Sequence, residues 1–157
     1  MVYELYKRPL AAFFLPAPPS EPSPRQEFRT LPEEDLASLS RDTRLHLRKA
    51  HAYQLGLKDL YSNENPAATK IWRSITLSRG DDIAQKANSN RKHLGINLLV
   101  VSSWRDTEEA SRQWRNAIES TGVFVFKAPF KQNAISGFCL KDPEFSLAYI
   151  KKQHNKD

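Results

Sequence analysis

The stretch "TEEASRQWRNAIESTGVFVFK", residues 107–127, predicts a helix that runs directly into a strand. Asp106, followed three residues later by Glu109, resembles a capping box at the start of the helix. Apolar side chains then recur at helical spacing, and Gly122 stands at the C-terminal stop. "VFVF" is apolar on both alternating faces, which is typical of a strand covered on both sides. We expect the helix over 106–121 to form one cover and another part of the chain to form the second.

Two further strands are predicted downstream. Residues 135–140 form the first, Asp142 and Pro143 favour a turn, and residues 145–150 begin the other. Gly137, inside a strand, indicates either a bulge or a close backbone approach to a helix or a substrate. A helix followed by three short strands predicts an α+β domain with a small, incomplete antiparallel or mixed sheet.

The N-terminal half is predicted to be helical, with an extended link near its start. Pro9 suits the first turn of a short helix, and Pro16 ends it. The prolines that follow favour an extended, polyproline-like backbone. From Pro32 to about Tyr61, apolar residues recur at helical intervals, which predicts a second, longer helix.

The connection from this helix to residue 104 has two predicted parts. Ile75 and Leu77 alternate with polar residues, which indicates a short half-exposed strand or an extended link. A further helix is predicted to start near Asp81 or Asp82 and to end before Gly95, because acids stand at its start and basic residues near its end.

The composition indicates a globular protein with a mixed-charge surface. The hydrophobic content of 39% is below the roughly 45–50% usual for globular domains, but aromatic residues supply large apolar surfaces. The net charge is +6, yet acids are interspersed among the basic residues, which favours a solvated surface over a nucleic-acid interface. The single cysteine excludes an intrachain disulfide and favours a cytoplasmic location. The apolar run "LAAFFL" is too short to span a bilayer, so no membrane partner is expected.

No catalytic, metal-binding or cofactor-binding residue is assigned from the residue pattern. His46 and His51 point about 140° away from each other on an ideal helix, too far for one metal ion, and are interpreted as surface residues of a basic helix. His93 and His154 have no companion ligands nearby in the sequence. Cys139, in an apolar strand, is interpreted as a small buried hydrophobe.

The segment "RLHLRKAH", residues 44–51, is the strongest basic patch. It is interpreted as the solvated face of a core helix in preference to a phosphate-binding surface, which leaves a DNA partner open. The five glycines form no Gly-rich phosphate loop, so nucleotide binding has no support.

Three separate segments of the chain resemble segments of one protein family: "YKRPLAAFFLPAPPSEPSPRQEFRTLP", "RQWRNAIESTGVFVF" and "ISGFCLKDPEF". In this order they resemble the ImmA/IrrE family of zinc metallo-endopeptidases, in the long form with an N-terminal helix-turn-helix domain. The resemblance covers about residues 3–150. It implies four parts: a remnant of the last helix of a helix-turn-helix domain (1–15), a proline-rich linker (16–32), a helical connecting region (33–103) and the N-terminal part of a metallopeptidase-like domain (104–157).

The resemblance also implies which element follows the last strand in a complete family member. There, the strand similar to residues 145–150 leads to a helix with the HExxH motif, whose two His bind zinc and whose Glu activates water. This sequence has no HExxH motif and no counterpart of the family's zinc ligands or general base. The resemblance fades from Ser146, which stands where relatives have proline; Ala148 is expected to weaken the strand, and Lys151 and Lys152 occupy the region of an Asn. A chain truncated at both ends is implied, with zinc expected only in complete members.

One principal hypothesis and two alternatives follow. The chain is an N-terminal fragment of a repressor-cleaving type of peptidase, inactive by itself, whose "VFVF" strand lacks one cover and which can self-associate through the uncovered sheet face. Alternatively, it is a non-catalytic regulatory module that binds a transcriptional regulator of the repressor type, or DNA. As a further alternative, it is part of a split enzyme completed by a separate chain that carries HExxH.

Overall fold

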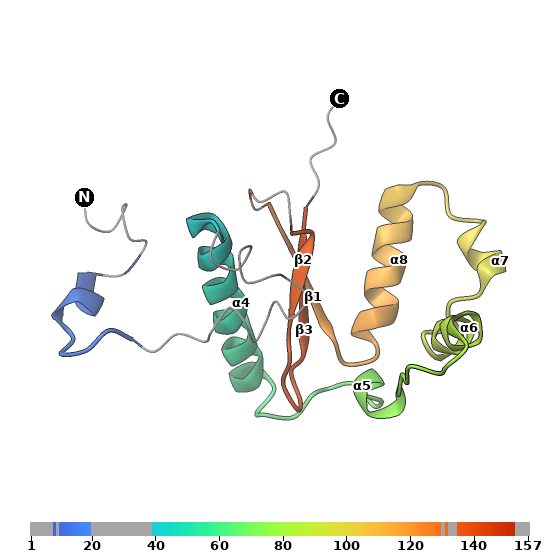
Figure 1. The fold of residues 1–157 in the computed structure, drawn as a ribbon, viewed down its shortest axis with the longest axis horizontal. Coiled ribbons are helices and arrows are strands. Elements are labelled where there is room, and N and C mark those ends of the chain that lie inside the picture. The colour runs from blue at the N-terminus through green and yellow to red at the C-terminus, as the bar shows by residue number, and fades with distance from the viewer. Residues whose placement is uncertain (1–7, 9, 20–38, 130, 132–134, 153–157) are drawn as a thin grey trace.

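A computed structural model describes residues 8, 10–19, 39–129, 131 and 135–152 of the chain. In these residues a small sheet lies between helices (Figure 1), so the chain has the α+β fold that the sequence predicts. The elements, in chain order, are η1 (Leu10–Phe14), α4 (Arg41–Leu60), α5 (Ile71–Ser74), α6 (Ile83–His93), α7 (Leu98–Val101), α8 (Thr107–Glu119), β1 (Phe124–Ala128), β2 (Gly137–Leu140) and β3 (Leu147–Lys151).

The sheet is mixed, with the order β1-β3-β2. β1 and β3 are parallel, with Phe124 opposite Leu147, whereas β2 and β3 form an antiparallel hairpin with Cys139 opposite Ala148. β3 is therefore the central strand, and its Leu147 and Tyr149 are only 1% exposed. Ala148, expected to weaken this strand, lies in β3 opposite Val125, and β3 pairs along its whole length with β1.

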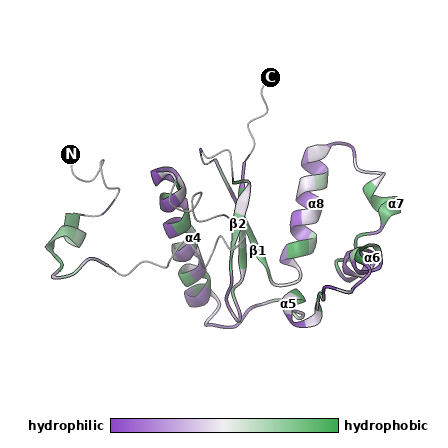
Figure 2. Cartoon of the chain, in the orientation of Figure 1, coloured by the Kyte–Doolittle hydropathy of each residue, from purple (hydrophilic) through white to green (hydrophobic). Residues whose placement is uncertain are grey.

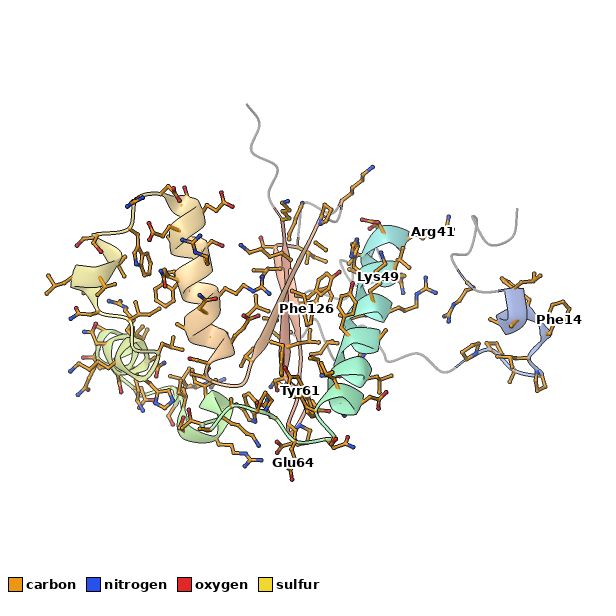
Figure 3. All side chains as sticks on the ribbon, turned by 180° about the vertical axis from the view of Figure 1, so that it is seen from behind. Phe14, Arg41, Lys49, Tyr61, Glu64 and Phe126 are labelled. Carbon is orange, nitrogen blue, oxygen red and sulfur yellow. The ribbon has the colours of Figure 1, made fainter. Side chains whose placement is uncertain are left out.

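The second cover of the "VFVF" strand is α4, which packs on one face of the sheet while α8 packs on the other (Figure 1). Phe126 lies between the sheet and α4 (Figure 3), stacked on Tyr53 with 4.8 Å between ring centroids. Phe124 faces Tyr61 at 6.0 Å on the same side. Val125, on the opposite face, is 4% exposed. The prediction that this strand lacks a cover is therefore wrong, because the helix that covers it precedes α8 in the sequence.

The core lies between α4 and the sheet. Two α4 side chains, Leu47 and Ala50, pack there against buried residues of β2 and β3. Phe138 stacks on Tyr149 with their rings 5.0 Å apart, and Leu140 is 1% exposed. Cys139 points to the other face of the sheet and is exposed. The cover on the α8 side is thus incomplete over β2, which is where an accessible part of the sheet face remains.

Polar caps position the helices as local sequence signals predict. Asp106 accepts a hydrogen bond from the amide of Glu109 at 2.7 Å, which confirms the predicted start of α8. Asp82 caps α6 in the same way, and Gly95 follows its end with a φ of +68°. α4 begins later than predicted within the described residues, because Ser40 is its N-cap. The part of the prediction that covers 32–38 lies outside the described residues.

The remaining segments are short and lie in the N-terminal part of the chain and in the connection from α4 to α8. The predicted N-terminal turn is the 3-10 helix η1, none of whose residues is buried. Residues 75–78 form no strand, so the extended link is the correct alternative there. The sequence patterns do not predict α5 and α7, of four residues each, as separate helices. Most of the predicted proline-rich linker lies outside the described residues.

Candidate functional site

The turn between β2 and β3, residues 142–146, is closed by its own side chains. Oδ1 of Asp142 accepts hydrogen bonds from the amides of Glu144 and Phe145, at 3.0 and 2.9 Å. The Ser146 hydroxyl accepts from the Asp142 amide at 3.2 Å and donates to the Asp142 carbonyl at 2.9 Å. Such an Asx turn fixes the direction of the chain as it enters β3. Ser146 therefore has a structural role in this turn.

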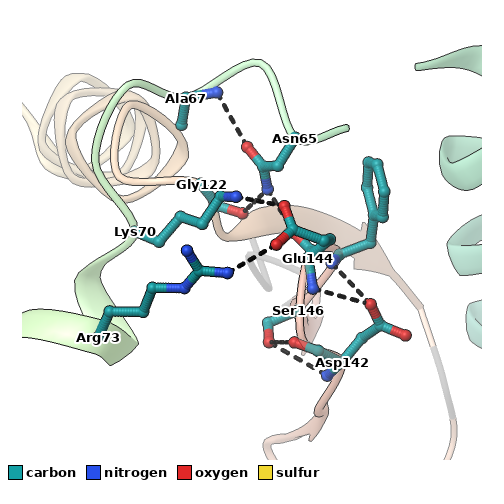
Figure 4. Close-up of polar contacts among 9 residues, drawn as sticks. Asn65, Ala67, Lys70, Arg73, Gly122, Asp142, Glu144 and Ser146 are labelled. Carbon is teal, nitrogen blue, oxygen red and sulfur yellow. Dashed lines mark hydrogen bonds and ion pairs between the residues drawn. The ribbon is translucent and has the colours of Figure 1, made fainter. Parts of the chain in front are cut away.

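A set of polar side chains, which we call the polar clamp, holds this turn against the segment that follows α4 (Figure 4); its members are Asn65, Lys70, Arg73, Asp142 and Glu144. The Asn65 amide nitrogen donates to the carbonyl of Glu144 at 2.5 Å and to that of Gly122 at 2.9 Å. Its oxygen accepts from the Ala67 amide at 2.9 Å. One asparagine thus ties the approach to β1 to the β2–β3 turn.

Gly122 fits this arrangement for two reasons. Its φ of +87° is in the region that favours glycine, and a Cβ would lie 3.3 Å from both side-chain polar atoms of Asn65. The glycine predicted to stop α8 therefore also makes room for the clamp.

Charged pairs complete the clamp. The Glu144 carboxylate accepts hydrogen bonds from Lys70 and, at 2.7 Å, from Arg73. The hydrogen bond from Lys70 holds the pKa of Glu144 below its usual value, against the opposing effect of burial and with help from Arg73. Burial pulls the pKa of Asp142 upward, but the hydrogen bond from Lys58 and those from the turn amides outweigh it and leave that pKa lowered. Both carboxylates are matched by cations, which suits holding the turn rather than proton transfer.

A row of three polar side chains, Asp42, His46 and Tyr149, crosses the core from α4 to β3. Nδ1 of His46 lies 2.9 Å from the hydroxyl oxygen of Tyr149, and its Nε2 lies 3.8 Å from Oδ1 of Asp42. Burial lowers the pKa of His46, although the Asp42 carboxylate opposes this shift. The order Asp, His, Tyr resembles a proton relay, but the Tyr149 side chain is 1% exposed and packed on Phe138. No substrate can reach its hydroxyl in this conformation, so we assign the row a structural role.

Two interpretations from the sequence are corrected here. His46 is 7% exposed and not a surface residue, because the face of α4 that carries it lies on the sheet; His51 is half-buried. Cys139 is exposed and not buried, because alternate residues of β2 point away from the core. His93 lies at the end of α6, 3.3 Å from the Ser74 hydroxyl. His154 lies outside the described residues.

The close approach predicted at Gly137 is to a neighbouring strand. A Cβ there would lie 2.7 Å from the carbonyl oxygen of Tyr149, so the partner is the β3 backbone and neither a helix nor a substrate. Gly137 is the first residue of β2 and not an interior one, and from Gly137 to Leu140 each residue pairs with one residue of β3, so no bulge interrupts this pairing. The basic patch over 44–51 lies on a core helix, as predicted, since Leu47 and Ala50 are buried and Lys49 is exposed.

The described residues do not fit a zinc ion. None of their His, Cys, Asp and Glu side chains form a group of three or more that could hold a metal. His46 illustrates the reason, because its Nδ1 is engaged by Tyr149 inside the core. A metal-dependent step is therefore not assigned to any described residue.

A groove lies apart from the clamp, between α6 and α7. Its volume is about 450 Å³, and it is lined by Asn88, Arg91, Lys92, Gly95, Ile96, Asn97 and Leu98. We call it the α6–α7 groove. The sequence predicts a connecting region here and contains no local signal for a concave surface, because the groove depends on the turn between two helices.

The fold and the polar clamp define a small α+β protein with a mixed sheet between helices. Comparisons of the chain with known protein families, with curated proteins and with solved structures find no match. Among the helices of the described residues, none has the length and apolar character needed to cross a membrane.

Proposed function

We propose that the chain is an N-terminal portion of an ImmA/IrrE-like zinc metallo-endopeptidase, of the repressor-cleaving type, and that it has no peptidase activity by itself. The observation that carries the proposal is the order of the three segments that resemble the family, ending at "ISGFCLKDPEF". The inactivity follows from the lack of an HExxH motif in the sequence, since that motif supplies two zinc ligands and the general base. A reducing, cytoplasmic location goes with this proposal.

The arrangement of the two later segments supports the proposal. "RQWRNAIESTGVFVF" includes most of α8 and the start of β1, and "ISGFCLKDPEF" includes β2 and all of the turn except Ser146. Asn65 joins the two through Gly122 and Glu144. They therefore form one packed unit, as expected of parts of a single domain.

The direct test of the family assignment is the DNA around the coding sequence. Codons for HExxH downstream in any frame would support a peptidase interrupted after residue 157, and HExxH in an adjacent gene would support the split enzyme. If neither is present, no missing catalytic part exists near this coding sequence, which would contradict the family assignment.

The test of inactivity is enzymatic. The purified chain, with and without zinc, is incubated with a helix-turn-helix repressor and with unfolded casein, and cleavage is followed by mass spectrometry. We expect no cleavage that a chelator abolishes. Chelator-sensitive cleavage by this chain alone would refute the proposal. Cleavage that appears on adding a separate HExxH-bearing chain would favour the split enzyme.

A second candidate function is a non-catalytic regulatory module that binds another protein. The α6–α7 groove favours it, because it is a concave surface with basic side chains and no assigned occupant. A repressor-type protein is the partner that the resemblance would supply, whereas DNA binding has only the basic patch of α4 in its favour.

A further inference from the structure

The α6–α7 groove is built by a tight turn after α6. The amide of Ile96 donates to the carbonyl of Arg91 at 2.9 Å, and the amide of Gly95 donates to that of Lys92 at 3.0 Å. With Gly95 at a φ of +68°, this is a Schellman-type end, which satisfies the last carbonyls of α6. The turn sends the chain into α7, and Ile96, 7% exposed, anchors it. The walls of the groove therefore belong to a defined turn.

The groove carries two positive charges and no negative one. Arg91 and Lys92 line it, and no Asp or Glu is among the lining residues. Neither cation makes an ion pair within the described part of the chain, whereas other cations of the connecting region do: Lys86 pairs with Asp81, and Lys70 pairs with Glu144. At the end of α6 the carbonyls of Asn90, Arg91 and Lys92 already accept hydrogen bonds from backbone amides of the turn. The charge of the groove is therefore available to a ligand.

Aliphatic side chains adjoin this charge. Leu98 lines the groove and is 59% exposed, and the next two residues, Leu99 and Val100, are 78% and 50% exposed. In Figure 2 α7 is a strongly hydrophobic segment at the end of the molecule beyond α8, far from α4. These three adjacent aliphatic residues, in a helix of four, place exposed apolar side chains directly beside the charged groove.

We propose that the α6–α7 groove binds a peptide segment of another protein in which one or two carboxylates adjoin an aliphatic side chain. Arg91 and Lys92 would receive the carboxylates by charge complementarity, and Leu98 would contact the aliphatic residue. The Asn88 and Asn97 side chains can hydrogen-bond to the peptide backbone at the rim. A peptide is favoured over nucleic acid because the lining has no aromatic ring on which a base could stack, while Leu98 matches no feature of a phosphate backbone.

This inference is independent of the proposed peptidase relationship, since the groove lies outside the segments over 112–126 and 135–145 that resemble the peptidase domain. If the DNA around the coding sequence removed the family assignment, the groove and its charges would be unchanged. The two proposals therefore fail separately.

The experiment starts with selection of random twelve-residue peptides, displayed on phage, against the immobilised full chain. Selected peptides are synthesised with a fluorescent label, and their affinities are measured by fluorescence anisotropy at two salt concentrations. The groove is tested with the double variant Arg91→Glu/Lys92→Glu, and with Leu98→Ser. The matched control is Arg79→Glu/Arg112→Glu, which makes the same change of net charge at exposed positions outside the groove. A labelled DNA duplex and a labelled single strand are measured alongside.

We expect the selected peptides to share Asp or Glu next to Leu, Ile, Val or Met. Their affinity should fall by about tenfold or more in Arg91→Glu/Lys92→Glu and by less than about threefold in the control pair. Leu98→Ser should weaken binding by several-fold without changing its salt dependence, because the lost contact is apolar. Thermal melts establish that each variant is folded; if the charge-reversal variant is not, Arg91→Gln/Lys92→Gln replaces it.

Three results would overturn the proposal. One is a selection that produces no acidic–aliphatic consensus. Another is an equal loss of affinity in the groove pair and the control pair, which would assign the effect to overall charge. The third is tighter binding of the oligonucleotides than of the peptides, with a dependence on Arg91 and Lys92, which would make the groove a nucleic-acid site.

Discussion

His46 of α4 and Tyr149 of β3 are joined by a hydrogen bond of 2.9 Å between Nδ1 and the phenol oxygen. The two residues are separated by 103 positions in the sequence, and both are buried. The bond therefore connects the helix that covers one face of the sheet with the central strand. Because burial removes water as a substitute partner, the loss of either group carries the cost of an unsatisfied polar atom.

Replacing Tyr149 with Phe tests this connection. The ring and its stacking on Phe138 remain, but the hydroxyl that faces His46 is removed. We expect the free energy of unfolding, measured by urea denaturation, to fall by about 1–3 kcal/mol. The matched control is Tyr53→Phe, at a residue that is 44% exposed, where the change should stay within about 0.5 kcal/mol. Equal effects of the two substitutions would show that the hydrogen bond does not stabilise the fold.

Replacing glycine with alanine is expected to have opposite effects on stability at Gly137 and at Gly56. In Gly137→Ala the new Cβ would meet the Tyr149 carbonyl oxygen at 2.7 Å, so we expect a loss of about 1–3 kcal/mol from strain in the sheet. In Gly56→Ala the Cβ meets no atom within 4 Å inside α4, so the better helix propensity should raise stability by about 0.5–1 kcal/mol. Urea denaturation of both variants measures the difference. The same sign for both would contradict the close approach at Gly137.

Asn65 is the member of the polar clamp with the most backbone contacts. Asn65→Ala removes the hydrogen bonds to Gly122, Glu144 and Ala67, and we expect the free energy of unfolding to fall by about 2 kcal/mol. Hydrogen exchange at the amides of the β2–β3 turn should accelerate as well, since the turn loses its outside support. Asn116→Ala, on the exposed side of α8, is the control and should leave both quantities nearly unchanged. Unaltered exchange in the Asn65 variant would rule out the clamp as a support.

Stability should fall in two stages as the pH is lowered. The pKa of His46 is depressed below its usual 6.5, chiefly by burial, so the unfolded chain binds a proton more readily than the folded chain. This contribution is fully present above about pH 6.5 and is lost as the pH falls through the depressed pKa. The pKa values of Asp142 and Glu144 are also depressed, from 3.8 and 4.5, so their contribution is present above about pH 4.5 and is lost below it.

Urea denaturation at a series of pH values resolves these stages. His46→Leu should reduce the decline that begins below about pH 6.5 and leave the lower stage unchanged. Glu144→Gln should reduce the lower stage and leave the upper one, and added salt should have the same effect because the Glu144 pairs are solvent-accessible. His51, whose pKa is also lowered by burial, adds to the upper stage. An upper stage of unchanged size in the His46 variant would refute its assignment.

The elements that the sequence predicts well are those with signals inside a few residues. α8 starts at the Asp106–Glu109 pair, and the chain turns at Gly122. α6 is defined by the Asp82 cap and Gly95 in the same way. These signals are local hydrogen bonds and backbone angles, so they can be seen without knowing what packs on the helix. α5 has no side-chain cap, and its first amide bonds the distant carbonyl of Thr121, which explains why local patterns do not predict it.

The errors concern side chains whose surroundings come from far along the chain. The basic residues around His46 predict a surface position, but the sheet packs on that face of α4. Cys139 lies between two apolar residues, yet it points to the face opposite the core. The cover missing from "VFVF" is α4, which lies more than sixty positions before β1 in the sequence. For His46 and Cys139 the local pattern is compatible with both a buried and an exposed side chain. For "VFVF" the pattern does not show which distant segment covers the strand.

By itself the sequence determined the α+β class, the caps of α6 and α8, and three strands in order, because capping groups, turn residues and apolar alternation act within a few positions. Tertiary structure decided that β3 is central and parallel to β1, that α4 covers the sheet, and that Asn65 and Glu144 meet. It also created the α6–α7 groove from a turn whose residues look like an ordinary connection. The physical reason is that burial and charge pairing depend on which distant surfaces come together, and the free energy of those contacts has no local sequence pattern.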